Sequence, residues 1–100
     1  MTSSKEIQKR IIDNKIKHGF NTTNVEKEFC YVYGELGEAY DAWLKSKDDL
    51  GSELADVAIF LYGLAEILGF DLAEEMEKKM AINEKRKYRE TAHGGHEKII

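Results

Sequence analysis

Four acidic residues stand in two pairs, and each pair has the spacing of one helical turn. The pairs are Glu35 with Glu38 and Glu53 with Asp56. Residues three apart on a helix lie on one face, so each pair would present two carboxylates side by side. Carboxylate oxygens are the ligands that Mg²⁺ and Mn²⁺ prefer. The spacing therefore predicts a divalent-metal site, provided that two helices bring the pairs together.

Asp56 is the most informative of the four because it lies in an apolar segment. Within residues 54–65 it is the only ionisable residue apart from Tyr62. A helix that is apolar on every face is buried, and an unpaired carboxylate there costs several kcal/mol. Clustered carboxylates repel one another unless cations lie between them. The alternative is that the three glutamates point to water and Asp56 caps a helix or accepts a hydrogen bond.

Apolar spacing and capping signals divide the chain into four expected helices. Three capping boxes precede apolar runs: Ser3 with Glu6, Thr23 with Glu26, and Asp71 with Glu74. The expected helices begin at these boxes or after the polar connection 45–48. They end at Gly19, before residue 45, at Gly69 and at about Lys87.

Apolar residues form a stripe along each of the two middle helices. The stripes are Val25, Phe29, Val32, Leu36, Ala39 and Trp43, then Leu50, Leu54, Val57, Leu61, Leu64 and Leu68. Spacings that alternate between four and three are typical of bundle seams. We therefore expect an all-α four-helix bundle with antiparallel neighbours, in which the acidic pairs lie beside the seam. Trp43 and Cys30 are expected to be buried.

Composition limits the class of protein. The 100 residues contain 42% hydrophobic and 34% charged residues and no proline, which fits one globular helical domain. The net charge of −4 argues against nucleic-acid binding, because that function needs a basic face to neutralise phosphates. A single cysteine, an N-terminus without a signal-like apolar core and the lack of a membrane-spanning run suggest a cytoplasmic protein. We expect residues 1–90 to form the domain and residues 91–100, with His93 and His96, to form a flexible tail.

The acidic pairs and their surroundings resemble the MazG-like superfamily of all-α nucleoside triphosphate pyrophosphohydrolases. The resemblance rests on GELGEAYDAW, SELADVAIFLYGLAEILGFDL and KMAINEKRKY, and it covers roughly residues 17–88. It implies Mg²⁺-dependent hydrolysis, with Mn²⁺ as an alternative, of a nucleoside triphosphate to the monophosphate and pyrophosphate. It also implies that Glu35, Glu38, Glu53 and Asp56 hold the ions, in a nucleotide-pool house-cleaning role. Glu38 is our choice for the base that accepts the proton of water.

Several other residues are expected to hold the substrate. Lys79, Asn83 and Arg86 share one face of the fourth helix, where they can meet phosphate and sugar; otherwise they form an ordinary basic helix end. Phe20 stands where relatives carry an aromatic residue that stacks on the base; otherwise it covers the end of the bundle. Tyr31 lies on the same expected helix stripe as Glu28, Glu35 and Glu38, and it either reaches the substrate or fills space.

Two other functions fit the same residues. A phosphoribosyl-ATP pyrophosphohydrolase has the same fold and acids, and a non-catalytic helical module would bind divalent ions or a partner helix. The helix before Gly69 is apolar on more faces than one neighbour can cover, so we expect a homodimer that completes a larger bundle, or a dimer of dimers.

Overall fold

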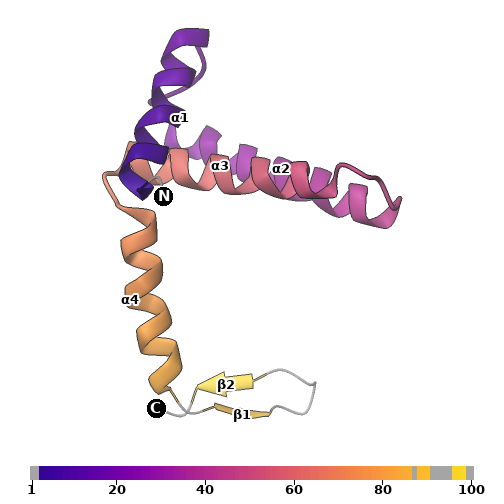
Figure 1. Cartoon of the computed structure of the whole chain (residues 1–100), viewed down its shortest axis with the longest axis vertical. Helices are drawn as coiled ribbons and strands as arrows, with labels where there is room; N and C mark the ends of the chain where they lie inside the picture. Colours follow the sequence, from indigo (N-terminus) through magenta and orange to yellow (C-terminus); the bar gives the residue numbers. More distant parts are fainter. Residues whose placement is uncertain (1–2, 87, 91–95, 99–100) are drawn as a thin grey trace.

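The computed structural model describes residues 3–86, 88–90 and 96–98, and within them it contains four helices followed by a hairpin of two short strands (Figure 1). The elements are α1 (Ser4–His18), α2 (Val25–Leu44), α3 (Leu50–Leu68), α4 (Leu72–Lys85), β1 (Tyr88–Glu90) and β2 (His96–Lys98). The expected all-α fold of four helices is confirmed. The hairpin was not expected, because strands of three residues are too short to show alternation in a sequence.

Capping side chains set the helix limits. Ser3 Oγ accepts a hydrogen bond from the Glu6 N–H, and Asp71 Oδ1 accepts one from the Glu74 N–H, both at 3.1 Å, as the capping boxes predict. Gly19 and Gly69 end α1 and α3 with φ of 70° and 84°, a conformation that favours glycine.

The predicted cap at Thr23 is wrong. Asn24 caps α2 instead, and its Oδ1 accepts from the Lys27 N–H at 3.1 Å. The Asn21 side chain closes a turn onto Asn24, since its Oδ1 accepts from the Asn24 N–H. This turn delays the start of the helix by one residue.

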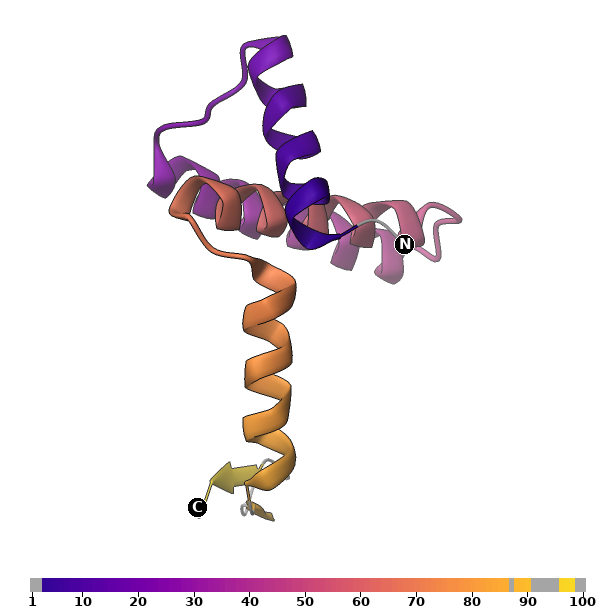
Figure 2. The same cartoon turned by 60° about the vertical axis from the view of Figure 1, so that its left-hand side comes forward.

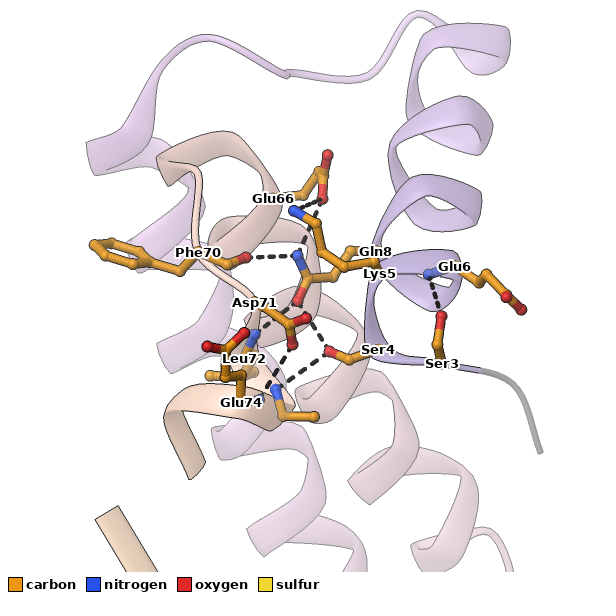
Figure 3. Close-up of polar contacts among 11 residues, drawn as sticks. Ser3, Ser4, Lys5, Glu6, Gln8, Glu66, Phe70, Asp71, Leu72 and Glu74 are labelled. Atoms are coloured by element: carbon orange, nitrogen blue, oxygen red, sulfur yellow. Dashed lines mark hydrogen bonds and ion pairs between the residues drawn. The ribbon is translucent and has the colours of Figure 1, made fainter. Parts of the chain in front are cut away.

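Helices α2 and α3 form an antiparallel hairpin, and α1 packs against α3 (Figures 1 and 2). The expected antiparallel packing of α4 on α3 is wrong, because α4 extends away from the other three helices and buries none of its residues. The chain turns at Gly69 to Asp71, where side chains of α1 hold the start of α4 (Figure 3).

The apolar core of the single chain is small and consists mainly of short side chains. Its most buried apolar residues are Ala39, Ala42, Leu64 and Ala65. Gln8, Lys15 and Glu28 are buried with them. The small residues Ala39 and Ala42 permit a close approach of α2 to α3.

Half of the twelve predicted seam residues are exposed, whereas Ala39 and Leu64 are buried as expected and the other four are half-buried. Phe29, Leu36 and Trp43 on α2 are 47%, 53% and 60% exposed, and Leu54, Leu61 and Leu68 on α3 are also exposed. Burial of Trp43 and Cys30 in the single chain was therefore a wrong prediction. Among the described helices, none combines the length and hydropathy of a membrane span.

Candidate metal centre and adjoining groove

Carboxylates from α2 and α3 converge at the centre of the helical hairpin. Glu35 and Glu38 lie one turn apart on α2, and Glu53 faces them from α3. One oxygen of each lies within 4.8 Å of the others. Glu35 and Glu53 are half-buried, whereas Glu38 is exposed. The antiparallel packing thus brings the first acidic pair against the second, and we call these three residues with Asp56 the acidic cluster.

Burial and then charge repulsion raise the pKa values of two members of the acidic cluster. Burial raises the pKa of Glu35, and the negative charges of Glu38 and Asp56 raise it further. Burial likewise raises the pKa of Glu53, with added repulsion from Asp49, Glu38 and Asp56. Asp56 is half-buried and close enough to act on both glutamates, although its oxygens lie outside the 4.8 Å group. All four acids therefore share one electrostatic environment.

Glu53 shows that the donor set fits a cation. Its Oε2 is buried and has no hydrogen-bond partner among the described residues. A buried acceptor without a partner costs about 1–3 kcal/mol, and a bound cation would remove that cost. Several hard oxygen donors in one place match the coordination preferences of Mg²⁺ and Mn²⁺.

A groove of about 1190 Å³ lies beside the acidic cluster, between α1 and the α2–α3 hairpin. Glu35 lines it, and so do Phe20 and Tyr31, the two aromatic residues expected near a substrate. The Tyr31 ring meets the Phe60 ring edge to face, with centroids 5.8 Å apart. Phe20 is 60% exposed, so its ring is accessible to a ligand. The structure therefore brings these aromatic residues and Glu35 to one cavity.

Cationic residues of the groove were missed by the sequence analysis. Arg10, Lys17 and Lys27 line it together with Asn14. Arg10, Asn14 and Lys17 have the i, i+4, i+7 spacing of one helix face, which is the same signal that singled out Lys79, Asn83 and Arg86. Applied to the first helix, that signal would have found them.

A buried ion pair fixes one wall of the groove. Lys15 Nζ pairs with Glu28 Oε1 and also donates to the Asn21 carbonyl at 3.2 Å. Asn21 Nδ2 donates to Glu28 Oε2 at 3.0 Å, and Glu28 is completely buried. The Lys15 ammonium lies 5.3 Å from the centroid of the Phe60 ring. These contacts tie α1 to α2 and hold the turn that carries Phe20.

The expected substrate residues of α4 are not brought to the acidic cluster within one chain. Lys79 and Asn83 lie on α4, which extends away from the hairpin (Figure 1), and Arg86 directly follows the end of this helix. Asn83 Oδ1 accepts a hydrogen bond from Arg86 Nη1 at 3.3 Å. A role for these residues at the acidic cluster would require a second copy of the chain.

This chain is similar to known proteins in sequence and in fold. The model of the MazG-like family matches residues 25–99. A dATP/dGTP diphosphohydrolase of Salmonella phage PMBT28 is 44% identical over 48 residues; the match covers 48% of this chain and 17% of that protein. This chain therefore spans only a small part of that relative.

The fold is similar to that of a solved structure over the full length of both chains. The cyanophage S-2L MazG-like pyrophosphohydrolase, bound to dGDP and three catalytic Mn²⁺ ions per active site, matches with a TM-score of 0.75 and 26% sequence identity. The match covers 100% of each chain.

Proposed function

The chain belongs to the MazG-like family, and from that membership we propose that it is a divalent-metal-dependent nucleoside triphosphate pyrophosphohydrolase. The reaction converts a nucleoside or deoxynucleoside triphosphate and water to the monophosphate and pyrophosphate. The observation that carries the proposal is the convergence of Glu35, Glu38 and Glu53, with the unpaired Oε2 of Glu53, at one end of a groove large enough for a nucleotide.

The metal ligands we propose are the four members of the acidic cluster. Mg²⁺ is our choice of ion, and Mn²⁺ is the alternative, as in the cyanophage relative. Bound divalent ions supply neutralisation of phosphate charge and acidification of water. The pKa values of Glu35 and Glu53 are raised first by burial and then by neighbouring acids, and bound cations would favour the ionised form of both groups.

Side chains around the metal ligands would accept a proton, stack on the base and contact phosphate. Glu38 is the exposed member of the converging glutamates, so we assign to it the acceptance of the proton from attacking water. Phe20 and Tyr31 would hold the base by stacking, which is worth roughly 1–3 kcal/mol for nucleic-acid bases. Arg10 and Lys17 would meet negative charge of the substrate.

The substrate class follows from the relatives. One is named for dATP and dGTP and the other binds dGDP, so purine deoxynucleotides are the substrates we propose first. Removing such nucleotides from the pool would be a house-cleaning role.

Pyrophosphate release from a nucleotide panel tests the proposal. The four deoxynucleoside triphosphates, the ribonucleotides and phosphoribosyl-ATP are incubated with the full chain and Mg²⁺ or Mn²⁺. We expect release from purine deoxynucleotides, and competition with phosphoribosyl-ATP separates the two enzyme classes. No release from any nucleotide by a helical, folded sample would favour a non-catalytic metal-binding module.

Glu38→Gln tests the proposed base. It should lower turnover by at least about 10²-fold, as expected for loss of a general base, and weaken Mg²⁺ binding without changing helicity. Glu77→Gln, an exposed position on α4, is the matched control and should retain turnover. Unchanged turnover in Glu38→Gln would remove Glu38 from the site.

A further inference from the structure

The acidic cluster lies between two openings along the α2–α3 hairpin. The groove is lined on α2 by Lys27, Tyr31 and Glu35, towards the start of the helix. A smaller hollow of about 420 Å³ lies on the other side, towards the α2–α3 turn, and is lined by Glu38, Glu53 and Lys47. A ligand laid along the hairpin would therefore cross the acidic cluster as it passes from the groove to the hollow.

The two openings differ in the chemistry of their walls. The groove carries Phe20, Tyr31 and Phe60, which suit a flat base. No aromatic side chain lines the hollow in the described part of the chain, where glycines, carboxylates and Lys47 are found instead. We infer that the hollow receives the pyrophosphate end of the substrate and that Lys47 is its phosphate-binding cation. This inference rests on the proposed function.

Two glycines in the middle of α2 keep the hollow open. A Cβ at Gly34 or Gly37 would meet no heavy atom within 4 Å, so packing within the chain does not require glycine there. Glycine inside a helix costs roughly 0.5–1 kcal/mol relative to alanine. Both glycines line the hollow, and their side-chain space is available to a ligand.

Lys47 is held at the edge of the hollow. Its Nζ lies 3.8 Å from Asp41 Oδ2, and its side chain is 50% exposed, so it can turn to a ligand without losing burial. Lys47 is the one cation among the described residues that line the hollow. Glu38, Asp41 and Glu53 make the hollow anionic overall, so pyrophosphate should bind only together with divalent cations.

Calorimetric titration of inorganic pyrophosphate into the full chain with Mn²⁺ tests the inference without turnover. Lys47→Met should weaken pyrophosphate binding roughly tenfold, the loss expected for one charge-assisted hydrogen bond, and leave deoxyadenosine monophosphate binding unchanged. Lys45→Met is the matched control: it removes the same charge from the same turn and the same partner, Asp41, but does not line the hollow. Gly37→Ala should also weaken pyrophosphate binding, although it favours the helix.

The contrary results separate a failure of the inference from a failure of the proposed function. An equal loss in Lys45→Met would show a general charge effect, and a selective loss of monophosphate binding in Lys47→Met would show the reverse orientation. Pyrophosphate binding in the presence of EDTA would contradict the required cations. A wild-type chain that binds pyrophosphate through Lys47 but hydrolyses no nucleotide would refute the proposed function alone. Turnover with unchanged pyrophosphate affinity in Lys47→Met would refute only this subsite.

Discussion

Lys15 and Glu28 place two opposite charges inside a chain whose apolar core is small. Burial removes hydration from both groups, and the pair survives because Lys15 also donates to the Asn21 carbonyl while Glu28 accepts from the Asn21 amide. Each charge is therefore tolerated in the interior only while its partner is present. Removing one charge leaves the other charge buried without a partner. Replacing both residues with apolar ones leaves no unpaired charge in the interior.

This asymmetry gives a prediction for stability. Lys15→Met and Glu28→Leu should each lower the free energy of unfolding by about 3–5 kcal/mol, and the double variant should recover most of that loss. Urea denaturation followed by circular dichroism measures it. Lys9→Met, which breaks the exposed Lys9–Asp13 pair, is the control and should cost no more than about 1 kcal/mol. Additive losses in the double variant would contradict this account.

The raised pKa values of Glu35 and Glu53 predict a dependence on pH. A folded-state pKa above the ordinary value of 4.5 means that the native chain binds protons more tightly than the unfolded chain. Ionisation of these groups therefore destabilises the metal-free protein above the raised pKa, and this penalty disappears as the pH falls towards 4.5. The same protons compete with Mn²⁺, so its affinity should weaken over the same range.

A variant in which residues 35 and 53 cannot ionise isolates their contribution to the pH dependence of stability. At neutral pH, Glu35→Gln/Glu53→Gln should melt at a higher temperature than the metal-free wild type, and the difference should shrink as the pH falls through the window above 4.5. Mn²⁺ titrations in two buffers with different ionisation enthalpies would count the released protons. A constant difference in melting temperature, or no proton release, would mean that the two carboxylates do not titrate as described.

Individual site residues were predictable where the signal was local. The acids stand three apart on neighbouring helices, so hairpin packing alone brings Glu35 near Glu53. Lys15 and Asn21 carry no such signal, since a lysine on a helix is usually exposed and only the fold makes Glu28 its neighbour. Lys47 was treated as part of a polar connection because its position beside the acidic cluster depends on the geometry of the α2–α3 turn.

At the level of elements, one glutamine determines where α4 points. Gln8 is completely buried, and its Nε2 donates to Glu66 Oε1 at 3.0 Å and to the Phe70 carbonyl at 2.7 Å (Figure 3). Its Oε1 accepts from the Leu72 N–H at 2.9 Å and from Ser4 Oγ at 3.1 Å. Free N–H groups at the start of α4 are thus satisfied by α1.

Replacing Gln8 should release α4. Gln8→Leu leaves the part-buried Leu72 N–H and Phe70 carbonyl without their partner, so we expect a loss of about 2–6 kcal/mol in stability, from about 1–3 kcal/mol for each group. Hydrogen exchange at Leu72 and Ala73 should accelerate more than exchange within α2. Ser4→Ala, which removes one acceptor from the Ala73 N–H, should have a smaller effect. Unchanged exchange at Leu72 in Gln8→Leu would show that Asp71 alone fixes α4.

The limits of the helices were predicted well, but the direction of α4 and the buried face of α2 were predicted poorly. Capping residues and glycines act within a few positions, so α1, α3 and α4 begin or end where the sequence indicates. The direction of α4 depends on Gln8, more than sixty residues away, and could not be predicted. The buried face of α2 was predicted only in part, because Ala39 of the apolar stripe is buried while the larger Phe29, Leu36 and Trp43 of the same stripe are exposed.

For the whole molecule, that outward stripe supports the predicted homodimer. Phe29, Leu36 and Trp43 lie on one face of α2 at bundle spacing, yet about half of each side chain is exposed. Apolar surface of this extent marks an interface, and a second copy offers the same stripe. Leu36→Glu should therefore convert a dimer or larger assembly to monomer in sedimentation, while Thr23→Glu, an exposed control, should not. A wild-type monomer at micromolar concentration would contradict the prediction.

Assembly would also decide whether α4 serves the reaction. Within one chain α4 extends away from the hairpin that carries the acidic cluster (Figure 1), so we expect Lys79, Asn83 and Arg86 to serve the cluster of another copy. A chain with all three replaced by alanine and a Glu38→Gln chain should each be inactive. When the two are mixed and refolded together, mixed dimers should regain turnover, because one site combines intact acids with an intact α4. If α4 served its own chain, every mixed site would carry a defect and no activity would return.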